Sequence, residues 1–280
     1  MDAFKKRKII NNFVLVLSTL AALLGLIWLF WILGTLLYKG LGSLSLEVIL
    51  GDPPAPGDNH GGLKHAIVGQ TLIVLTATVI GIPLGILAGT YLSEYGKNSR
   101  IANIVRDLSD IMMSIPSIVV GTFIYALMVK PLGHFSGLAG SLSLAIMMIP
   151  IIVRTTDDML RMVPPELREA AYALGATKFR VIKDVVYRAA ITGIITGVIL
   201  SVARIGGETA PLLFTSFNNN FFTLNMLQPM ASLTVTMYDY AMSPYKYWQE
   251  LAWAAAILLT FGVLGANILG RVVAHYKFKK

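Results

Sequence analysis

Six stretches of this chain are long and apolar enough to cross about 30 Å of hydrocarbon as helices. Charged residues make up 14% of the chain and hydrophobic residues 55%, whereas a soluble domain carries about 25% charged residues. We therefore expect an all-α integral membrane protein with six transmembrane helices. They should cover approximately Phe13–Leu37, Ala66–Leu92, Ile111–Val129, Leu138–Val153, Ala190–Phe214 and Leu251–Ala274.

Two of these stretches depart from the usual length of a span. The fourth is short, so we expect its helix to continue into the charged residues that follow Val153. The first follows a basic cluster at 5–8 and is about twice as long as the apolar region of a secretory signal peptide. No small-residue cleavage site follows it, which predicts a retained membrane anchor.

The distribution of lysine and arginine predicts the orientation. If the N-terminus is cytoplasmic, the inner side receives 18 of the 23 basic residues and the outer side receives four. This bias places both termini inside and accounts for the net charge of +8 without nucleic-acid binding. The prediction comprises a cytoplasmic N-terminus (1–12), a transmembrane domain (13–274), a cytoplasmic C-terminus (275–280), an inner loop (154–189) and outer loops (38–65 and 215–250).

The inner loop has the local signals of two short helices. Pro164 and Pro165 precede an acidic first turn and predict a helix over about Glu166–Leu174, which Gly175 should terminate. A second helix is expected over Lys178–Val186. Alanines leave one face of the first helix small-sided, so another protein could approach it closely. The alternative is an amphipathic helix on the membrane surface, for which larger apolar side chains would be more suitable.

Four residues of the first helix and its stop, Glu169, Ala170, Ala171 and Gly175, match the EAA-x3-G signature of ABC-importer permeases. The later part of that signature, Ile-x-Leu-Pro, is replaced here by Val-Val-Tyr-Arg at 185–188. The resemblance implies that this coupling helix inserts into a cleft on a separate nucleotide-binding subunit. The chain has no complete phosphate-binding loop, since Gly175-Ala176-Thr177-Lys178 lacks the second glycine. ATP and Mg are therefore expected on the partner, with no cofactor, metal or catalytic residue in this chain.

Two arginines lie in or beside apolar spans. Arg204 lies about fifteen residues into the fifth span, where an arginine costs about 2.5–3.5 kcal/mol on insertion scales. Glu208 follows at i+4, and Arg154 has acids at i+3 (Asp157) and i+4 (Asp158). Such pairs could line a polar route for an anion. The alternatives are a structural Arg204–Glu208 pair and an Arg154 that reaches lipid phosphates.

The chemistry of these pairs bears on the choice of anion. The planar guanidinium donates two parallel hydrogen bonds to an oxyanion. Phosphate near neutral pH still carries protons and can donate to a carboxylate, whereas sulfate and molybdate cannot. An arginine lining with added acids would accept phosphate and repel a fully deprotonated dianion.

Longer segments resemble the phosphate branch of the ABC-importer permeases, namely Pro150–Thr156, Ala203–Thr215, Ala241–Pro244 and Trp248–Ala254. The resemblance implies a type I importer permease (MetI-like) fold that forms half of a translocation pathway. It places Arg154, Asp157, Arg204 and Glu208 on that pathway. The implied partners are a homologous permease (PstC-like), an ATPase dimer (PstB-like), an extracytoplasmic phosphate-binding protein (PstS-like) and lipid, in the inner membrane of a prokaryote.

Other readings stay open from the residues alone. The same architecture could carry another oxyanion or a phosphonate. An intramembrane enzyme would need a nucleophile with a base or paired catalytic acids, and neither stands out. A non-transporting assembly subunit would have little reason to bear the cost of Arg204.

The remaining signals concern helix packing and the outer side. Gly81, Gly85 and Gly89 predict close helix packing, with a mobile joint at Pro83 as the alternative. Prolines are expected to break three spans, and the four scattered histidines are expected to be solvent-exposed. An outer aromatic set predicts either a belt at the lipid headgroups or a rim for an extracytoplasmic partner. These groups are Pro116, Pro150 and Pro211; His60, His65, His134 and His275; and Phe217, Phe221, Phe222, Tyr238, Tyr240, Tyr245, Tyr247 and Trp248.

Overall fold

The computed structural model describes residues 3–96 and 99–278, and every regular element among them is a helix. Lys97, which the orientation count places inside, and residues 279–280 of the expected C-terminal segment lie outside the described residues. The elements are α1 (Ala3–Gly42), α2 (Leu46–Leu50), α3 (Lys64–Thr90), η1 (Tyr91–Tyr95), α4 (Arg100–Ser114), α5 (Ser117–Ile124), η2 (Tyr125–Val129), α6 (Lys130–Leu132), α7 (Gly137–Arg161), α8 (Pro165–Ala173), α9 (Lys178–Arg180), η3 (Val181–Val186), α10 (Tyr187–Gly206), α11 (Ala210–Leu213), α12 (Leu233–Ala241) and α13 (Lys246–Phe278).

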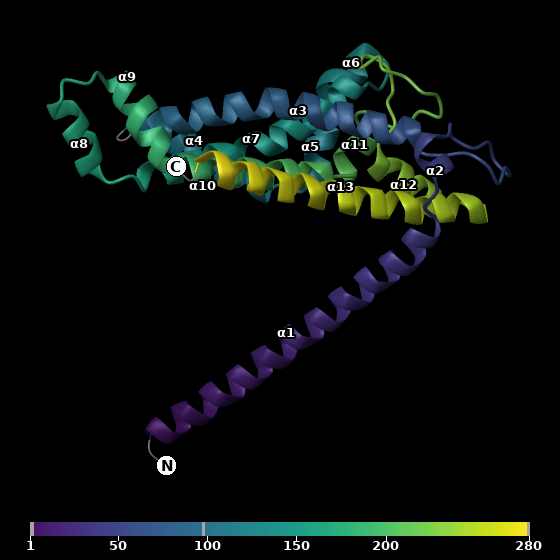
Figure 1. Ribbon diagram of the computed structural model, residues 1–280, viewed down its shortest axis with the longest axis horizontal. Helices are drawn as coiled ribbons and strands as arrows, with labels where there is room; N and C mark the ends of the chain where they lie inside the picture. The colour runs from purple at the N-terminus through teal and green to yellow at the C-terminus, as the bar shows by residue number, and fades with distance from the viewer. Residues whose placement is uncertain (1–2, 97–98, 279–280) are drawn as a thin grey trace.

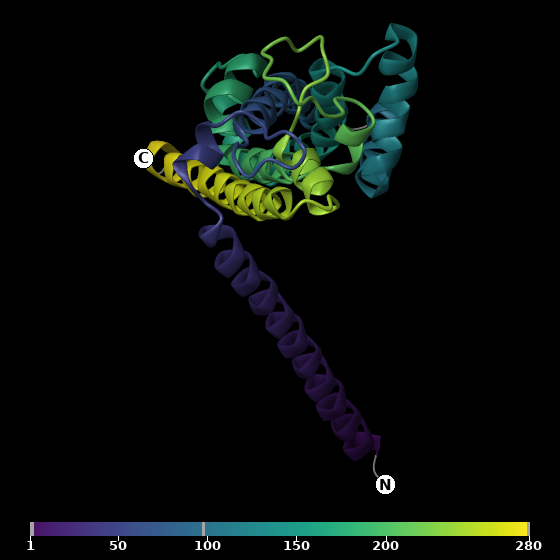
Figure 2. The ribbon, with the colours of Figure 1, turned by 90° about the vertical axis from the view of Figure 1, so that its right-hand side faces the viewer.

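Long helices α3, α7, α10 and α13 lie side by side as a bundle, and α1 projects away from it (Figures 1 and 2). Gly40, near the end of α1, lies against Ile257 and Trp253 of α13. No residue in the apolar 18-residue window of α1 is buried within the chain itself. Apart from its C-terminal end around Gly40, helix α1 therefore takes no part in the core that this chain forms alone.

Helices α3 and α7 make the most extensive contact in the bundle. A Cβ atom added to Gly85 would lie 2.7 Å from Cβ of Ile152, and one added to Gly89 would lie 2.6 Å from the carbonyl oxygen of Val153. Gly81 lies in the same way against Met148. Absent side chains let two backbones approach, which is how helices associate in membranes. The predicted glycine packing is confirmed.

Within residues 3–96 and 99–278, five helices are long and apolar enough to cross a membrane, and a sixth span arises if a bent pair is counted as one. That pair is α4 and the segment Ser117–Leu132, which meet at 105° around Pro116. The sequence prediction of a third span beginning at Ile111 is therefore wrong at its start, because the chain turns sharply between Ser114 and Ser117. Proline restricts the residue before it to extended backbone, which ends α4.

The other prolines differ in whether they interrupt their helices. Helix α7 continues through Pro150 and α3 through Pro83, so neither interrupts its span. Neighbouring helices and side chains can satisfy the backbone groups that a proline frees. At Pro211 the break is confirmed, since α10 ends at Gly206 and the fifth predicted span stops about two turns before Phe214. The fourth span does continue into charged residues, as far as Arg161.

Candidate functional site: a coupling helix and arginine–carboxylate pairs

Helix α8 lies at one end of the bundle (Figure 1). It exposes an apolar patch. Pro165 begins it and Gly175 ends it with φ +78, a left-handed conformation that glycine adopts without strain. No residue of α8 is buried. Leu174 is 89% exposed, and Leu167 and Tyr172 are also exposed. The predicted helix and its stop are confirmed, and they present a surface that this chain leaves uncovered.

The four residues of the EAA-x3-G signature lie on this helix and its stop. Glu169, Ala170 and Gly175 are exposed, whereas Ala171 is half-buried. Ala171 packs against the apolar cluster that Val181 and Val186 form at the start of the next helix. The predicted second helix is confirmed as α9 and η3, which lead directly into α10. One side of α8 is therefore seated on the bundle and the other is free.

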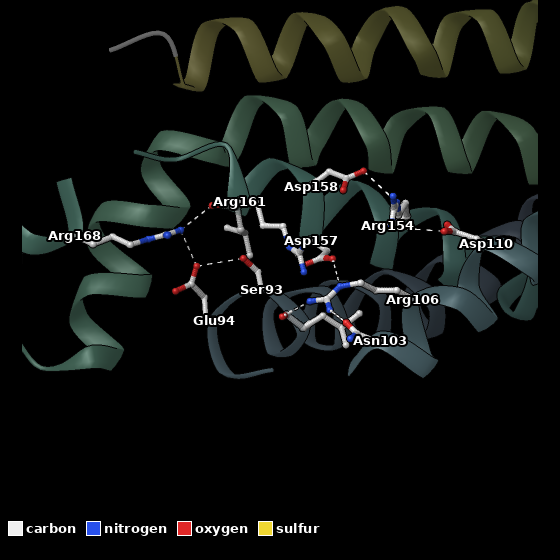
Figure 3. Close-up of polar contacts among 12 residues, drawn as sticks. Ser93, Glu94, Asn103, Arg106, Asp110, Arg154, Asp157, Asp158, Arg161 and Arg168 are labelled. Atoms are coloured by element: carbon white, nitrogen blue, oxygen red, sulfur yellow. Dashed lines mark hydrogen bonds and ion pairs between the residues drawn. The ribbon is translucent and has the colours of Figure 1, made fainter. Parts of the chain in front are cut away.

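Arg154 lies on α7 between two carboxylates (Figure 3). Its Nε is 3.3 Å from Oδ2 of Asp158, and its Nη1 is 3.7 Å from Oδ2 of Asp110 on α4. The arginine side chain is 39% exposed. Both contacts are longer than the roughly 2.7–2.9 Å of a tight charge-assisted hydrogen bond, so the guanidinium has donors to spare.

Asp157 belongs to a different group of side chains. It is fully buried, and its two carboxylate oxygens accept from Nε of Arg106 at 2.7 Å and from Nε of Arg161 at 2.9 Å. Arg106 also donates to Asn103 and to the carbonyl oxygen of Leu92. The structure thus does not bring Asp157 together with Arg154, because α4 packs on that side of α7 and Arg106 takes the carboxylate (Figure 3).

Arg204 and Glu208 lie where α10 ends. Nε of Arg204 is 4.0 Å from Oε1 of Glu208, and their side chains are 49% and 19% exposed. The glutamate is beyond the helix, in a turn that the amide of Gly207 closes by donating to the carbonyl oxygen of Arg204. Thr234 of α12 donates to the carbonyl oxygen of Glu208 and holds that turn. The predicted pair is present, but loosely.

The two half-exposed arginines lie on adjoining helices. Thr155 fits against Gly197 and Met159 against Gly193, so α7 and α10 run antiparallel in close contact. In this register Arg204 is about six residues, or about 9 Å, further along the bundle than Arg154. No hydrogen bond or ion pair joins the two sites among the described residues. Arg154 and Arg204 thus place two basic groups at different heights along the α7–α10 pair.

The outer aromatic set splits into buried and exposed members. Tyr240 is buried and stacks on Trp248 at a centroid distance of 4.7 Å, while Phe221 and Tyr238 are exposed. Burial raises the pKa of Tyr240 to about 12, with a further contribution from the nearby Asp239. Burial also raises the pKa of Asp239, although the hydrogen bond from Asn218 opposes this. Only part of the set is thus available to lipid or to a partner.

The expectation that the histidines are exposed holds for two of them. His60 and His134 are exposed, and the side chain of His275 lies outside the described residues. His65 is buried at the start of α3, so the prediction is wrong there. Neither of its ring nitrogens has a hydrogen-bond partner among the described residues.

Comparison with known proteins decides the family. Residues 81–276 match the model of the binding-protein-dependent transport system inner membrane component. The chain belongs to this permease family. It is 52% identical over 276 residues to the "Phosphate transport system permease protein PstA" of Pasteurella multocida, covering 99% of this chain and 98% of that one. It is 37% identical over 241 residues to the "Probable phosphate transport system permease protein PstA" of Methanocaldococcus jannaschii, covering 85% of this chain and 84% of that one.

Solved permease-containing transporters share the fold at low identity. A chain of a bacterial alginate ABC transporter, in complex with a pentasaccharide-bound periplasmic protein, gives a TM-score of 0.70 at 14% identity, covering 98% of each chain. A chain of the MetNI methionine ABC transporter gives 0.61 at 19% identity, covering 76% of this chain and 93% of that one. The permease is thus a multi-pass inner-membrane protein with the predicted importer fold.

The permease also holds charged residues for which the sequence predicts no part in the site. Arg106 and Arg161 hold Asp157, and Asp110 reaches Arg154 from α4. The sequence gives a signal for two of these residues, Arg106 and Asp110, through the pattern of α4. Its apolar residues Ile101, Ile104, Leu108 and Ile111 recur at helical spacing, and Arg106 and Asp110 lie off that stripe.

Proposed function

We propose that this permease is the transmembrane subunit of an ATP-driven importer of inorganic phosphate and forms half of the translocation pathway. One observation carries this proposal: the 52% identity over 99% of the chain to a relative named a phosphate transport system permease protein. A relative from Haemophilus influenzae with the same name is also 52% identical over 274 residues.

The chemistry of the half-exposed arginines supports a phosphate pathway. Arg154 and Arg204 are partly open, loosely paired and on adjoining helices. Guanidinium donors suit oxyanions, and the carboxylates beside them can accept a hydrogen bond from protonated phosphate but not from sulfate. An anion that replaced Glu208 or Asp110 at its arginine would exchange one oxygen ligand for another.

The exposed face of α8 supports coupling to a separate ATPase. Its small side chains, its free apolar patch at Leu174 and its confirmed glycine stop fit a helix that docks in another subunit. ATP and Mg would bind to that subunit, so this chain hydrolyses nothing. The full importer would add a related permease and an extracytoplasmic phosphate-binding protein, with both termini of this chain in the cytoplasm.

A direct test is reconstitution in lipid vesicles with the related permease, the ATPase and the binding protein. We expect phosphate to stimulate ATP hydrolysis and to be taken up, and sulfate to do neither. Stimulation by another oxyanion or a phosphonate, with none by phosphate, would replace the substrate with that anion. Hydrolysis of phosphate esters by the purified chain would favour an enzyme instead.

The proposed coupling through α8 can be tested with a matched pair of variants. Leu174→Glu places a charge on the exposed patch of α8 and should abolish phosphate-stimulated ATP hydrolysis. Leu46→Glu makes the same change on an exposed leucine of α2, at the opposite end of the bundle, and should leave it unchanged. Equal activity of the two variants would argue against docking through α8.

A further inference from the structure

Helix α8, whose outer side is exposed, is attached to the bundle by one buried ion pair (Figure 3). Nη2 of Arg168, on α8, donates to Oε1 of Glu94 at 2.8 Å and to the carbonyl oxygen of Leu160 at 2.7 Å. The side chains of Arg168 and Glu94 are 11% and 7% exposed. Ser93 also donates to Oε1 of Glu94. One nitrogen of α8 therefore contacts two other helices at once.

The two groups that accept hydrogen bonds from Arg168 belong to two different transmembrane helices. Glu94 lies in η1, the π-helical turn that continues α3, and Leu160 lies in the last turn of α7. Helix α8 has no buried residue of its own, and its other attachment is the small apolar contact of Ala171. Arg168 is thus the one charged side chain of α8 that reaches into the bundle.

A continuous set of close contacts runs from this pair to the half-exposed arginines. Helix α3 is fixed to α7 by the glycines at 81, 85 and 89, at distances that leave no room for a methyl group. Helix α7 carries Arg154 and fits against α10, which carries Arg204, through Gly193 and Gly197. Closely packed elements transmit displacement because they cannot deform gradually.

We propose that the Arg168–Glu94 pair is the positioning contact that transmits movement of α8 to the transmembrane helices bearing Arg154 and Arg204. The proposal rests on the proposed function, since it names how that site is coupled to the ATPase. Movement of α8 pulls on α3 and α7 together, and their glycine contact makes them respond as one body.

A purely stabilising role would not require charge at this place. Burying an ion pair costs desolvation, and well-packed apolar residues often stabilise as much. A directional bond from one nitrogen to two helices, by contrast, holds α8 at a fixed position relative to both. The test must therefore measure coupling as well as stability.

The experiment uses the complete reconstituted importer and measures phosphate taken up per ATP hydrolysed. Glu94→Gln and Arg168→Gln should assemble and hydrolyse ATP, with phosphate transported per ATP lower by at least about fivefold, the low end of typical coupling between sites. Arg168→Lys keeps the positive charge and has one nitrogen that can donate several hydrogen bonds. It should therefore transport more phosphate per ATP than Arg168→Gln. Asp239→Asn is the control: it removes a partly buried, hydrogen-bonded carboxylate from α12 and should leave the ratio unchanged.

Several outcomes decide between the possibilities. An unchanged ratio in both glutamine variants overturns the proposal, and so does a loss equal to that in Asp239→Asn. If the glutamine variants do not assemble, Glu94→Asp decides, since it keeps the charge but withdraws it by about one bond length; full coupling there also overturns the proposal. Failure of the unmodified importer to take up phosphate would instead overturn the proposed function.

Discussion

The permease contains two kinds of arginine–carboxylate contact, and they differ in how many of their hydrogen-bond donors and acceptors are already occupied. In the buried network, made of Arg106 and Asp157 with the half-exposed Arg161 at its edge, both carboxylate oxygens are taken and Arg106 donates through all three of its nitrogens. In the half-exposed pairs, Arg154 with Asp110 and Asp158 and Arg204 with Glu208, the contacts are 3.3–4.0 Å long. Arg106 and Asp157 thus have no hydrogen-bonding capacity left for a ligand, whereas Arg154 and Arg204 have.

Burial explains the difference. A charge taken out of water must find partners for each donor and acceptor, so a fully buried carboxylate is saturated by the fold itself. A half-exposed guanidinium keeps access to water or to an anion. Residue type therefore does not distinguish Arg106 from Arg154 and Arg204, but their remaining hydrogen-bonding capacity does.

The sharpest test of the comparison is Asp157→Asn. Losing the charge leaves the buried Arg106 without a carboxylate, and breaking a buried pair costs about 3–5 kcal/mol. We expect a corresponding loss of stability in denaturation of the purified importer. Asp158→Asn changes the neighbouring, half-exposed acid and should cost at most about 1 kcal/mol. Unchanged stability with lost uptake in Asp157→Asn would move Asp157 to the substrate pathway, as the sequence predicted.

Arg204→Gln should show the opposite behaviour. Its pair with Glu208 is long and half-exposed, so stability should change by less than about 1 kcal/mol. Uptake should fall by at least about tenfold, because a hydrogen bond to a charged group contributes about 1.5–3 kcal/mol. Arg204→Lys keeps the charge without the planar fork and should be intermediate. Normal uptake by Arg204→Gln would contradict a role for this arginine in anion passage.

Local signals made part of this arrangement predictable from the sequence. The ends of α8 follow from Pro165 and Gly175, which act on their own backbone, and the prediction agrees within one residue. The contact of α3 with α7 follows from the spacing of three glycines. Such features depend on neighbours a few residues away, which the sequence displays directly.

The assignment of Asp157 could not be predicted in this way. Helical spacing places Asp157 and Asp158 equally near Arg154, and the choice between them is made by Arg106, 51 residues away in the chain. Likewise Pro116 indicated a break but not the 105° turn that brings α4 across α7. Both depend on tertiary packing, which overrides what the local pattern leaves open.

A smaller effect is expected from Glu208→Gln, which bears on selectivity. The carboxylate can accept a hydrogen bond from protonated phosphate, and one such hydrogen bond contributes about 1 kcal/mol, or about fivefold in the preference for phosphate over sulfate. Uptake of both anions, measured in competition, gives this preference. The control is Glu250→Gln, an exposed acid of α13. An unchanged preference would leave Glu208 without a part in selection.

The smallest effect concerns Asp110, which competes with any anion for Nη1 of Arg154 from 3.7 Å away. Asp110→Asn removes that competitor, and since exposed pairs contribute at most about 1 kcal/mol, the KM for phosphate uptake should fall by about twofold. Asp107, one turn earlier on α4, is also exposed but makes no ion pair among the described residues, so Asp107→Asn should leave the KM unchanged. A KM that rises in Asp110→Asn would mean that the aspartate holds Arg154 in place for the anion, and the half-exposed pairs would then resemble the buried network in function.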